Sequence, residues 1–426
     1  MPKPFDVRPW APSRRLLTAC AFLFATAGFD AAAEPLTLPE ALSRAAAYDP
    51  SLPAADARMR AAEAGVRQAG VRPNPSLGAE LENFAGTGDI GLADRSEATL
   101  YYEQTWERGG KRAARVDVAR AELALARGRA SVRALDLLAE VQTAWVEALA
   151  AEAAIAVAEE QLAVARRLEG EVARRVRAAR DPLFSGERAR TATAQARIDR
   201  DQALAAAEQA RAVLASYWGG GPVFDLNASA LEPGSVVLPG PITDTPDLRL
   251  LATERDLSQA RVAVERARAV QDPRWRAGLR HFGESNDVAV IIGGSIPLGR
   301  NDTNRGGIER AQAERTAAEV DLAAARIERE REVARLTARR AATLAEVARS
   351  DAEVAPSAAR AVTLVRDGFN RGGGAFTYLE VAEAQRGVIE AQSRRIDLLK
   401  RFHLDGVRLD RLTGRHAALL ANAETR

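Results

Sequence analysis

Residues 107–180 contain no proline and no other convincing helix breaker. The larger apolar residues recur at three- and four-residue steps, as in Leu135, Leu138 and Val141, which is the spacing of one helical face. At about 1.5 Å per residue, a helix over this whole range would extend roughly 110 Å. Such a helix does not fit inside an ordinary compact domain, so we expect it to pack beside other long helices.

The composition favours exposed helices of this kind. Charged residues make up 28% of the chain and aromatic residues only 5%, a mixture typical of coiled-coil-like helices rather than of a thick globular core. Residues 1–33 hold four of the 60 basic and two of the 58 acidic residues, which leaves 56 of each in the remainder. This balance gives no reason to expect nucleic acid as a partner.

The N-terminal stretch is typical of a secretory signal peptide. Arg14 and Arg15 precede an apolar run over residues 16–27, and three alanines at 31–33 provide a cleavage signature. We therefore expect an exported chain that begins at Glu34. Residues 17–20 also resemble a lipoprotein lipobox ending at Cys20, the single cysteine of the chain; if Cys20 leaves with the signal, the mature chain has no thiol for a disulfide or zinc site.

The second half of the chain repeats the order of the first at an offset of about 190–198 residues, which indicates an internal duplication. Each unit consists of a helix, a strand hairpin, a very long helix and a return helix. We expect a signal peptide at 1–33, a linker at 219–245 and a C-terminal tail at 415–426. The first repeat is expected at 34–218, with a hairpin at 76–106, a long helix at 107–180 and a return helix at 184–218. The second repeat is expected at 246–414, with a hairpin at 274–297, a long helix at 303–367 and a return helix at 376–412.

The hairpin at 274–297 alternates between apolar and charged side chains, which predicts strands with two different faces. The apolar face is expected to meet lipid, and it carries Trp275, Leu279, Val290 and Ile292. The opposite face carries Arg274, Arg276 and Arg280. The turn at 283–287 is then expected outside the cell. The strands are about ten residues long, which is the length of a tilted membrane-spanning strand.

Four strands cannot close a membrane barrel, because such barrels begin at about eight strands. An open sheet in lipid would leave its edges without hydrogen bonds. A homotrimer with a shared 12-stranded barrel is the simplest closed solution. We therefore predict a mostly α chain with a small transmembrane β part, whose long helices form an α-helical barrel. The alternative is a non-transporting periplasmic coiled-coil scaffold, against which the signal peptide and the repeated strand length argue.

Three segments resemble a known family: residues 36–42 (LTLPEAL) with Asp49-Pro50, residues 72–83 (RPNPSLGAELEN) with residues 109–112 (GGKR), and residues 374–385 (GAFTYLEVAEAQ). With them, the whole mature chain resembles the TolC-like outer-membrane efflux proteins, especially the cobalt–zinc–cadmium resistance branch. One departure is residues 105–107 (TWE), where the family has a Gln-Pro-like step into the helix.

The resemblance implies a trimeric exit duct in outer-membrane lipid with a long periplasmic extension. It also implies docking to a periplasmic adaptor protein and an inner-membrane pump of the RND type, with heavy-metal cations as cargo. Alternatively, the duct exports drugs or other small molecules.

The resemblance further implies functions for the turns between long helices. Glu380 and Glu383 lie three residues apart, and in the family acidic residues one turn apart line a periplasmic gate; an ordinary solvated helix face is the alternative. The candidate adaptor-contacting tips are Asp181 and Pro182 in the first repeat and Gly372, Gly373 and Gly374 in the second, although glycine and proline also simply make turns.

Nothing in the sequence indicates an enzyme, a cofactor or a resident metal. The three histidines (His281, His403 and His416) are not paired at ligand spacing. Gly109-Gly110-Lys111 lacks the first glycine of a phosphate-binding loop, and it is expected to form the turn from strand to helix. After the signal the sequence also has no run of about 18 apolar residues, and we therefore expect no helix to span a membrane.

Overall fold

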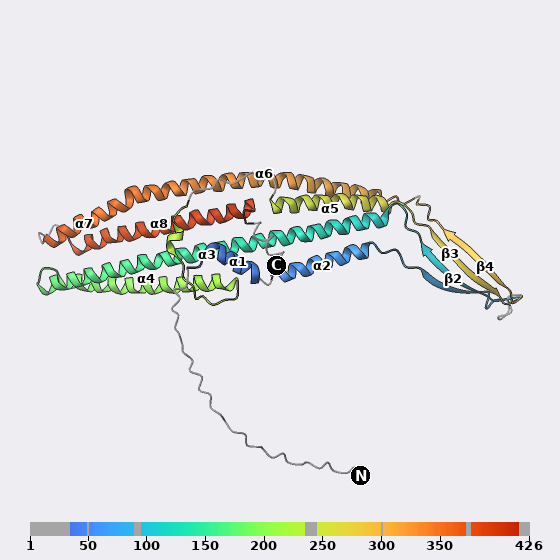
Figure 1. The fold of residues 1–426 in the computed structure, drawn as a ribbon, viewed down its shortest axis with the longest axis horizontal. Helices are drawn as coiled ribbons and strands as arrows, with labels where there is room; N and C mark the ends of the chain where they lie inside the picture. Colours follow the sequence, from blue (N-terminus) through green and yellow to red (C-terminus); the bar gives the residue numbers. More distant parts are fainter. Residues whose placement is uncertain are drawn as a thin grey trace, which may run out of the picture. The chain divides into compact units, whose positions relative to one another are not determined.

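The computed structural model describes residues 35–48, 51–88, 95–234, 245–299, 301–371 and 376–416 (Figure 1). The expectations for the signal peptide at 1–33, for Cys20 and for Gly372, Gly373 and Gly374 fall outside these residues. So do most of the expected C-terminal tail and part of the linker.

The described residues are mainly helical. The helices are α1 (Leu38–Tyr48), α2 (Ser51–Ala69), α3 (Lys111–Arg177), α4 (Leu183–Ser216), α5 (Pro246–Arg268), α6 (Arg305–Arg349), α7 (Ala355–Arg371) and α8 (Tyr378–Thr413), with a 3-10 turn η1 (Ala228–Leu231) and a π-turn η2 (Ser350–Val354). A four-stranded antiparallel sheet is formed by β1 (Ser76–Glu82), β2 (Glu97–Thr105), β3 (Arg274–Phe282) and β4 (Val288–Ser295), in that order. The expectation of a mostly helical chain with a small sheet is confirmed.

The longest helix begins four residues later than expected. Gly109 and Gly110 have φ angles of 67° and 74°, a left-handed conformation that glycine adopts without steric cost. They form the turn that separates β2 from the first residue of α3. At the other end, Ala179 has a φ of 56°, so the helix ends at Arg177 and not at Arg180.

The long helix of the second half differs from the single helix expected over 303–367. It is interrupted by η2, where the Ala355 N–H donates to the Ser350 carbonyl five residues earlier. Pro356 follows directly. Proline has no N–H and its ring clashes with the carbonyl four residues before it, and a π-turn is one way to accommodate this inside a helix. Figure 1 shows the helix changing direction between α6 and α7.

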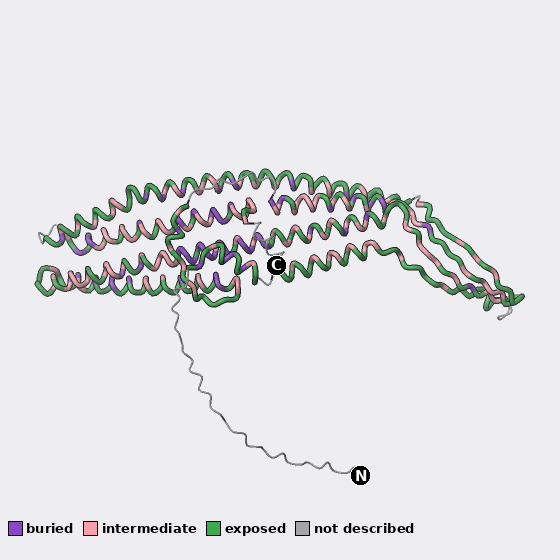
Figure 2. The backbone as a smooth tube through the Cα atoms, viewed as in Figure 1, coloured by how far each residue is buried: buried purple, intermediate pink, exposed green. Residues whose placement is uncertain are grey.

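The helices pack side by side, with α3 at the centre. It contacts α4 and α8 along one part of its length and α2 and α5 along the other, while α6 packs on α5 and α8. α3 contains an 18-residue window that is, by length and composition alone, apolar enough to cross a membrane. Half of that window is buried against neighbouring helices, as in the core helix of a helical protein. Figure 2 shows buried residues concentrated along α3 and near α1.

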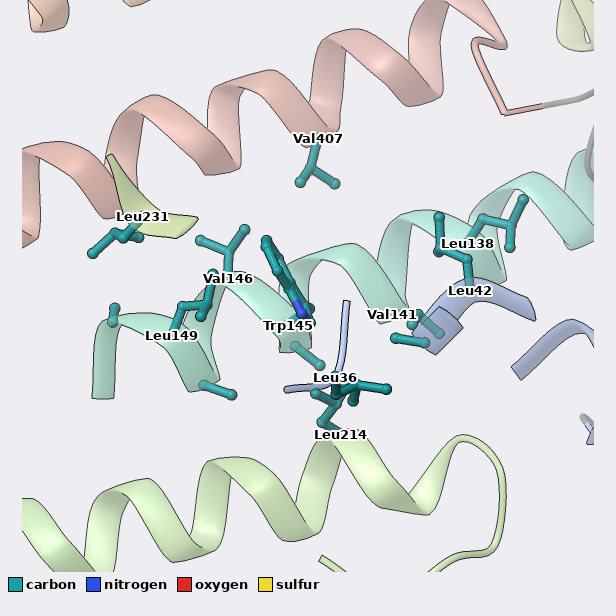
Figure 3. Close-up of a cluster of buried hydrophobic side chains, with 14 of the residues drawn as sticks. Leu36, Leu42, Leu138, Val141, Trp145, Val146, Leu149, Leu214, Leu231 and Val407 are labelled. Carbon is teal, nitrogen blue, oxygen red and sulfur yellow. The ribbon is translucent and has the colours of Figure 1, made fainter. Parts of the chain in front are cut away.

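The main apolar core lies where α1, η1 and the ends of α4 and α8 meet the middle of α3. Figure 3 shows Trp145 at the centre of this cluster, between Val407 of α8 and Leu214 of α4. At the start of α1, the Glu40 carboxylate accepts from the Thr37 N–H at 2.9 Å and from the Thr37 hydroxyl at 3.0 Å, which is the glutamate half of a capping box. We call the segment that contains η1, residues 224–234, the strap.

Candidate functional site

One face of the sheet is apolar and exposed. The register pairs Leu279 with Leu100 on one side and with Val290 on the other, so these side chains share a face. The four residues expected to meet lipid all lie on it: Trp275 is 52% exposed, Leu279 54%, Val290 73% and Ile292 79%. Leu77, Leu81, Leu100 and Tyr102 extend the same face. A continuous exposed apolar surface of this kind indicates contact with lipid or with a partner.

The opposite face of the sheet is charged and cross-linked. Arg280 donates to the Thr99 hydroxyl at 2.9 Å and to the Glu97 carboxylate at 2.8 Å, and it pairs with Glu82 at 2.9 Å. One arginine on β3 therefore connects β1, β2 and β3. Arg274 lies 3.9 Å from Glu103 on the same face.

The ring of Tyr101 lies across the middle of the charged face, over Gly78 and near Arg276. A Cβ atom at Gly78 would lie 2.5 Å from Cζ of Tyr101, which shows that the Tyr101 ring occupies the space above this glycine. The guanidinium of Arg276 lies 5.7 Å from the centre of the same ring, within the range of a cation–π interaction. Glycine at position 78 is therefore required for the ring to lie across the neighbouring strand.

The junction between sheet and helices is fixed by charges. The Arg108 N–H donates to Asp272 at 2.9 Å, and Lys111 Nζ donates to the other oxygen of the same carboxylate at 2.6 Å. Burial works against ionisation of Asp272, but the bonds from Lys111 and Arg108 outweigh it and lower the pKa of this carboxyl. The Gly109-Gly110-Lys111 segment thus forms the junction between β2 and α3, as expected from the sequence. The bond from Lys111 to Asp272 holds the start of α3 beside the residues that lead into β3.

At the far end of α3, one arginine joins the two helical hairpins. Arg175 donates to both carboxylate oxygens of Asp181, at 2.8 and 3.1 Å, and to the Phe369 carbonyl of α7 at 2.7 Å. Its guanidinium also lies 4.0 Å from the centre of the Phe369 ring. Arg175 and Asp181 are mostly buried. We call these three residues the tip clamp.

The α3–α4 turn also exposes large apolar side chains. Leu183 is 80% exposed and Phe184 62% exposed, directly after the expected tip residues Asp181 and Pro182. Asp181 is held by the tip clamp, and Pro182 precedes the first residue of α4. An apolar helix start next to a buried ion pair is a surface suited to a protein partner.

Glu380 and Glu383 lie near the start of α8, and each has its own partner. The Glu380 carboxylate accepts from the Thr377 N–H at 2.5 Å and from its hydroxyl at 2.6 Å, completing a capping box. These bonds, the one from the hydroxyl foremost, lower the pKa of Glu380. Glu383 pairs with Arg386 at 2.9 Å on an exposed surface. Both carboxylates are exposed in the single chain.

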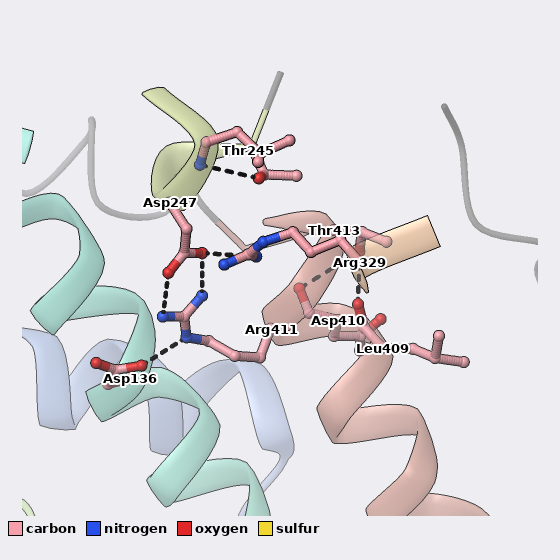
Figure 4. A network of polar contacts seen from close by, with 9 residues as sticks. Asp136, Thr245, Asp247, Arg329, Leu409, Asp410, Arg411 and Thr413 are labelled. Atoms are coloured by element: carbon pink, nitrogen blue, oxygen red, sulfur yellow. Dashed lines mark hydrogen bonds and ion pairs between the residues drawn. The ribbon is translucent and has the colours of Figure 1, made fainter. Parts of the chain in front are cut away.

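A second charged cluster, which the sequence did not indicate, joins α3, α5, α6 and α8 (Figure 4). Arg411 binds Asp136 at 2.6 Å and Asp247 at 2.6 and 3.0 Å, and Arg329 binds Asp247 at 3.0 Å. Burial opposes ionisation of Asp247, but the two arginines outweigh it and lower the pKa of this carboxyl. This network fixes the positions of four helices whose residues are far apart in sequence.

The histidines have separate environments. His281 Nε2 lies 2.9 Å from the Asn286 side chain, and His403 Nε2 lies 2.8 Å from the Leu231 carbonyl. Burial, the main cause, lowers the pKa of His403. Among the described residues, no group of three or more potential ligands is arranged to hold a metal ion.

Comparison with known proteins assigns this architecture to a class. The family model described as "Outer membrane efflux protein" matches residues 41–220. The cobalt-zinc-cadmium resistance protein CzcC of Cupriavidus metallidurans is 30% identical over 90% of this chain and 91% of its own length. The nickel and cobalt resistance protein CnrC of the same organism is 33% identical over 70% of this chain and 72% of its own. The crystal structure of the outer membrane protein VceC from Vibrio cholerae shares the fold, with a TM-score of 0.70, 21% identity, and coverage of 88% of this chain and 96% of that one.

Long packed helices joined to a two-faced antiparallel sheet thus define an efflux channel of the outer membrane. The chain belongs to the outer membrane efflux protein family. The resemblance seen in the sequence and the expected outer-membrane location are confirmed.

Proposed function

We propose that three copies of this chain close a duct through the outer membrane and that the duct exports heavy-metal cations. The observation that carries this proposal is the exposed apolar face of an open four-stranded sheet. Among the described strands, β1 and β4 each have only one neighbour, and lipid does not tolerate free sheet edges. Three sheets placed edge to edge supply twelve strands, with the apolar faces toward lipid and Arg274, Arg276 and Arg280 toward the lumen.

The helices support the same assembly. α4 and the α6–α7 helix lie at opposite margins of the helical layer, since α3 and α8 separate them. Both margins expose large aliphatic residues: Ile198 and Val213 on α4, and Val320, Ile327 and Leu364 on α6 and α7. In a trimer, α4 of one copy packs against α6 and α7 of the next, which closes an α-helical barrel. In this proposal the two halves of each protomer arose by internal duplication.

The cargo follows from the relatives. CzcC and CnrC are named for resistance to cobalt, zinc, cadmium and nickel, and we transfer divalent metal cations to this chain on that basis. The alternative cargo is drugs or other small molecules. Selection of metal is assigned to the pump, because the described residues hold no clustered metal ligands.

The proposal also covers the partners that bind at the tips. We propose that the exposed Leu183 and Phe184, with Asp181, Pro182 and the residues 372–374, receive a periplasmic adaptor that connects the duct to an RND pump. The first turn of α8 then faces the axis, and three copies bring Glu380 and Glu383 together as a gate. Six carboxylates around one axis would attract cations and repel anions.

The decisive experiment is a deletion strain complemented with the intact gene. Deletion is expected to increase sensitivity to cobalt, zinc or cadmium and leave drug sensitivity unchanged, and complementation is expected to restore resistance. Sensitivity to drugs without sensitivity to metals would establish the alternative cargo.

A further inference from the structure

We infer that η2 is a hinge between α6 and α7 and that Arg395 of α8 holds this hinge to the strap. The π-turn replaces the regular ladder at Ser350, and Pro356 removes the next donor. A helix loses stiffness where its hydrogen bonds are shifted or absent. The long helix is therefore weakest at the point where its direction changes.

Arg395 of α8 joins the π-turn to the strap. Its Nε donates to Asp351 within the π-turn at 2.8 Å, and its two terminal nitrogens donate to Glu232 of the strap at 2.7 and 2.8 Å. A paired arrangement of guanidinium and carboxylate fixes direction as well as distance. We call Arg395, Asp351 and Glu232 the hinge latch. It connects the strap, through α8, to the first turn beyond α6.

The segment beyond the hinge has room to move. α7 packs along α8 and reaches α3 through Phe369 of the tip clamp. A groove of about 240 Å³ lies among α3, α7 and α8, and the apolar residues in its lining include Val164, Leu168, Val362, Val388 and Ile389. α7 thus packs on α8, with the hinge latch at the π-turn before its start, the tip clamp near its end, and a groove along one side. Release of either end allows α7 to rotate toward this groove.

The sequence offers a matched control for the hinge latch. Arg394, the preceding residue of α8, pairs with Glu346 of α6 at 2.7 Å, before the π-turn. Loss of this pair removes an arginine from the same helix without touching the hinge. Pro356→Ala should act in the opposite direction to loss of Arg395, since alanine restores the missing N–H donor.

Hydrogen exchange of the full chain, purified in detergent, tests the inference without requiring transport, so failure of metal export would not affect the result. Arg395→Gln should accelerate exchange of the α7 amides about tenfold, whereas Arg394→Gln should leave them at the wild-type rate. Pro356→Ala should slow them. Exchange in α4 serves as the measure of global opening. Equal rates in the two arginine variants, or unchanged α7 exchange in Pro356→Ala, would overturn the hinge.

Discussion

Arg175 of α3 donates to the main-chain carbonyl of Phe369 in α7 at 2.7 Å, while its guanidinium lies 4.0 Å from the ring of the same phenylalanine. Asp181 neutralises the arginine from the α3–α4 turn. A single side chain thus connects the ends of two helical hairpins that are separated by almost 200 residues. Because the contact is mostly buried, its loss is expected to loosen the ends of both helical hairpins.

Arg175→Met keeps much of the apolar stem but removes the ionic bonds of the tip clamp. We expect a local loss of about 1.4 kcal/mol, within the range for hydrogen bonds to charged groups after allowance for the remaining packing. Tryptic cleavage at the α3–α4 turn should become about tenfold faster, because cleavage follows the opened population. Arg174→Met, at an exposed neighbouring position, is the control. Equal cleavage rates for the two variants would refute the role of the tip clamp.

The two faces of the sheet predict opposite outcomes for neighbouring substitutions. Val290→Lys places a charge on the apolar face, which costs roughly 2–4 kcal/mol near the middle of a bilayer. Ala289→Lys places the same charge on the opposite face, where Ala289 pairs with Arg280. We expect the Val290 variant to lose most heat-modifiable trimer from outer-membrane fractions and the Ala289 variant to retain it. Similar yields from both variants would mean that the apolar face does not meet lipid.

Much of this arrangement is visible in the sequence because it depends on local chemistry. The period-two alternation around Leu279 predicts both faces of the sheet. The tip clamp, in contrast, could not be predicted from the local sequence. Which residue among Arg174, Arg175 and Arg177 faces α7 depends on the rotation of α3 accumulated over its whole length, and small departures from 3.6 residues per turn add up.

Two other features were missed for related reasons. Pro356 is visible in the sequence, but whether a helix ends there or accommodates the proline through a π-turn depends on packing against α8. The Arg411 network joins residues of four helices that no spacing connects. Arg411, Asp247 and Asp136 therefore have no shared signature in the sequence.

The Asp247 network predicts a pH dependence of stability. The pKa of Asp247 is lower in the folded chain than its ordinary value, so its contribution is present above the unfolded pKa of about 3.9 and is lost as the pH falls through the folded value. At pH 7 we expect Asp247→Asn to reduce the free energy of unfolding by about 3 kcal/mol, as for a broken buried ion pair. In thermal unfolding, the difference from wild type should shrink below about pH 4.

Asp201→Asn is the control for this measurement, because Asp201 pairs with Arg200 at an exposed position and should change stability by less than about 1 kcal/mol. A difference between Asp247→Asn and wild type that stays constant from pH 7 to pH 3 would contradict the assigned role of the carboxylate.

The gate can be tested without disturbing the helix that carries it. Glu380 closes the capping box of α8, and glutamine at this position also completes such a box. Glu380→Gln combined with Glu383→Gln therefore removes the charges and preserves the helix start. In planar bilayers we expect higher unitary conductance or weaker cation selectivity, because the proposed ring loses six carboxylates. Glu390→Gln, at an exposed position further along α8, is the matched control. Wild-type conductance and selectivity in the double variant would show that the two glutamates do not form a gate.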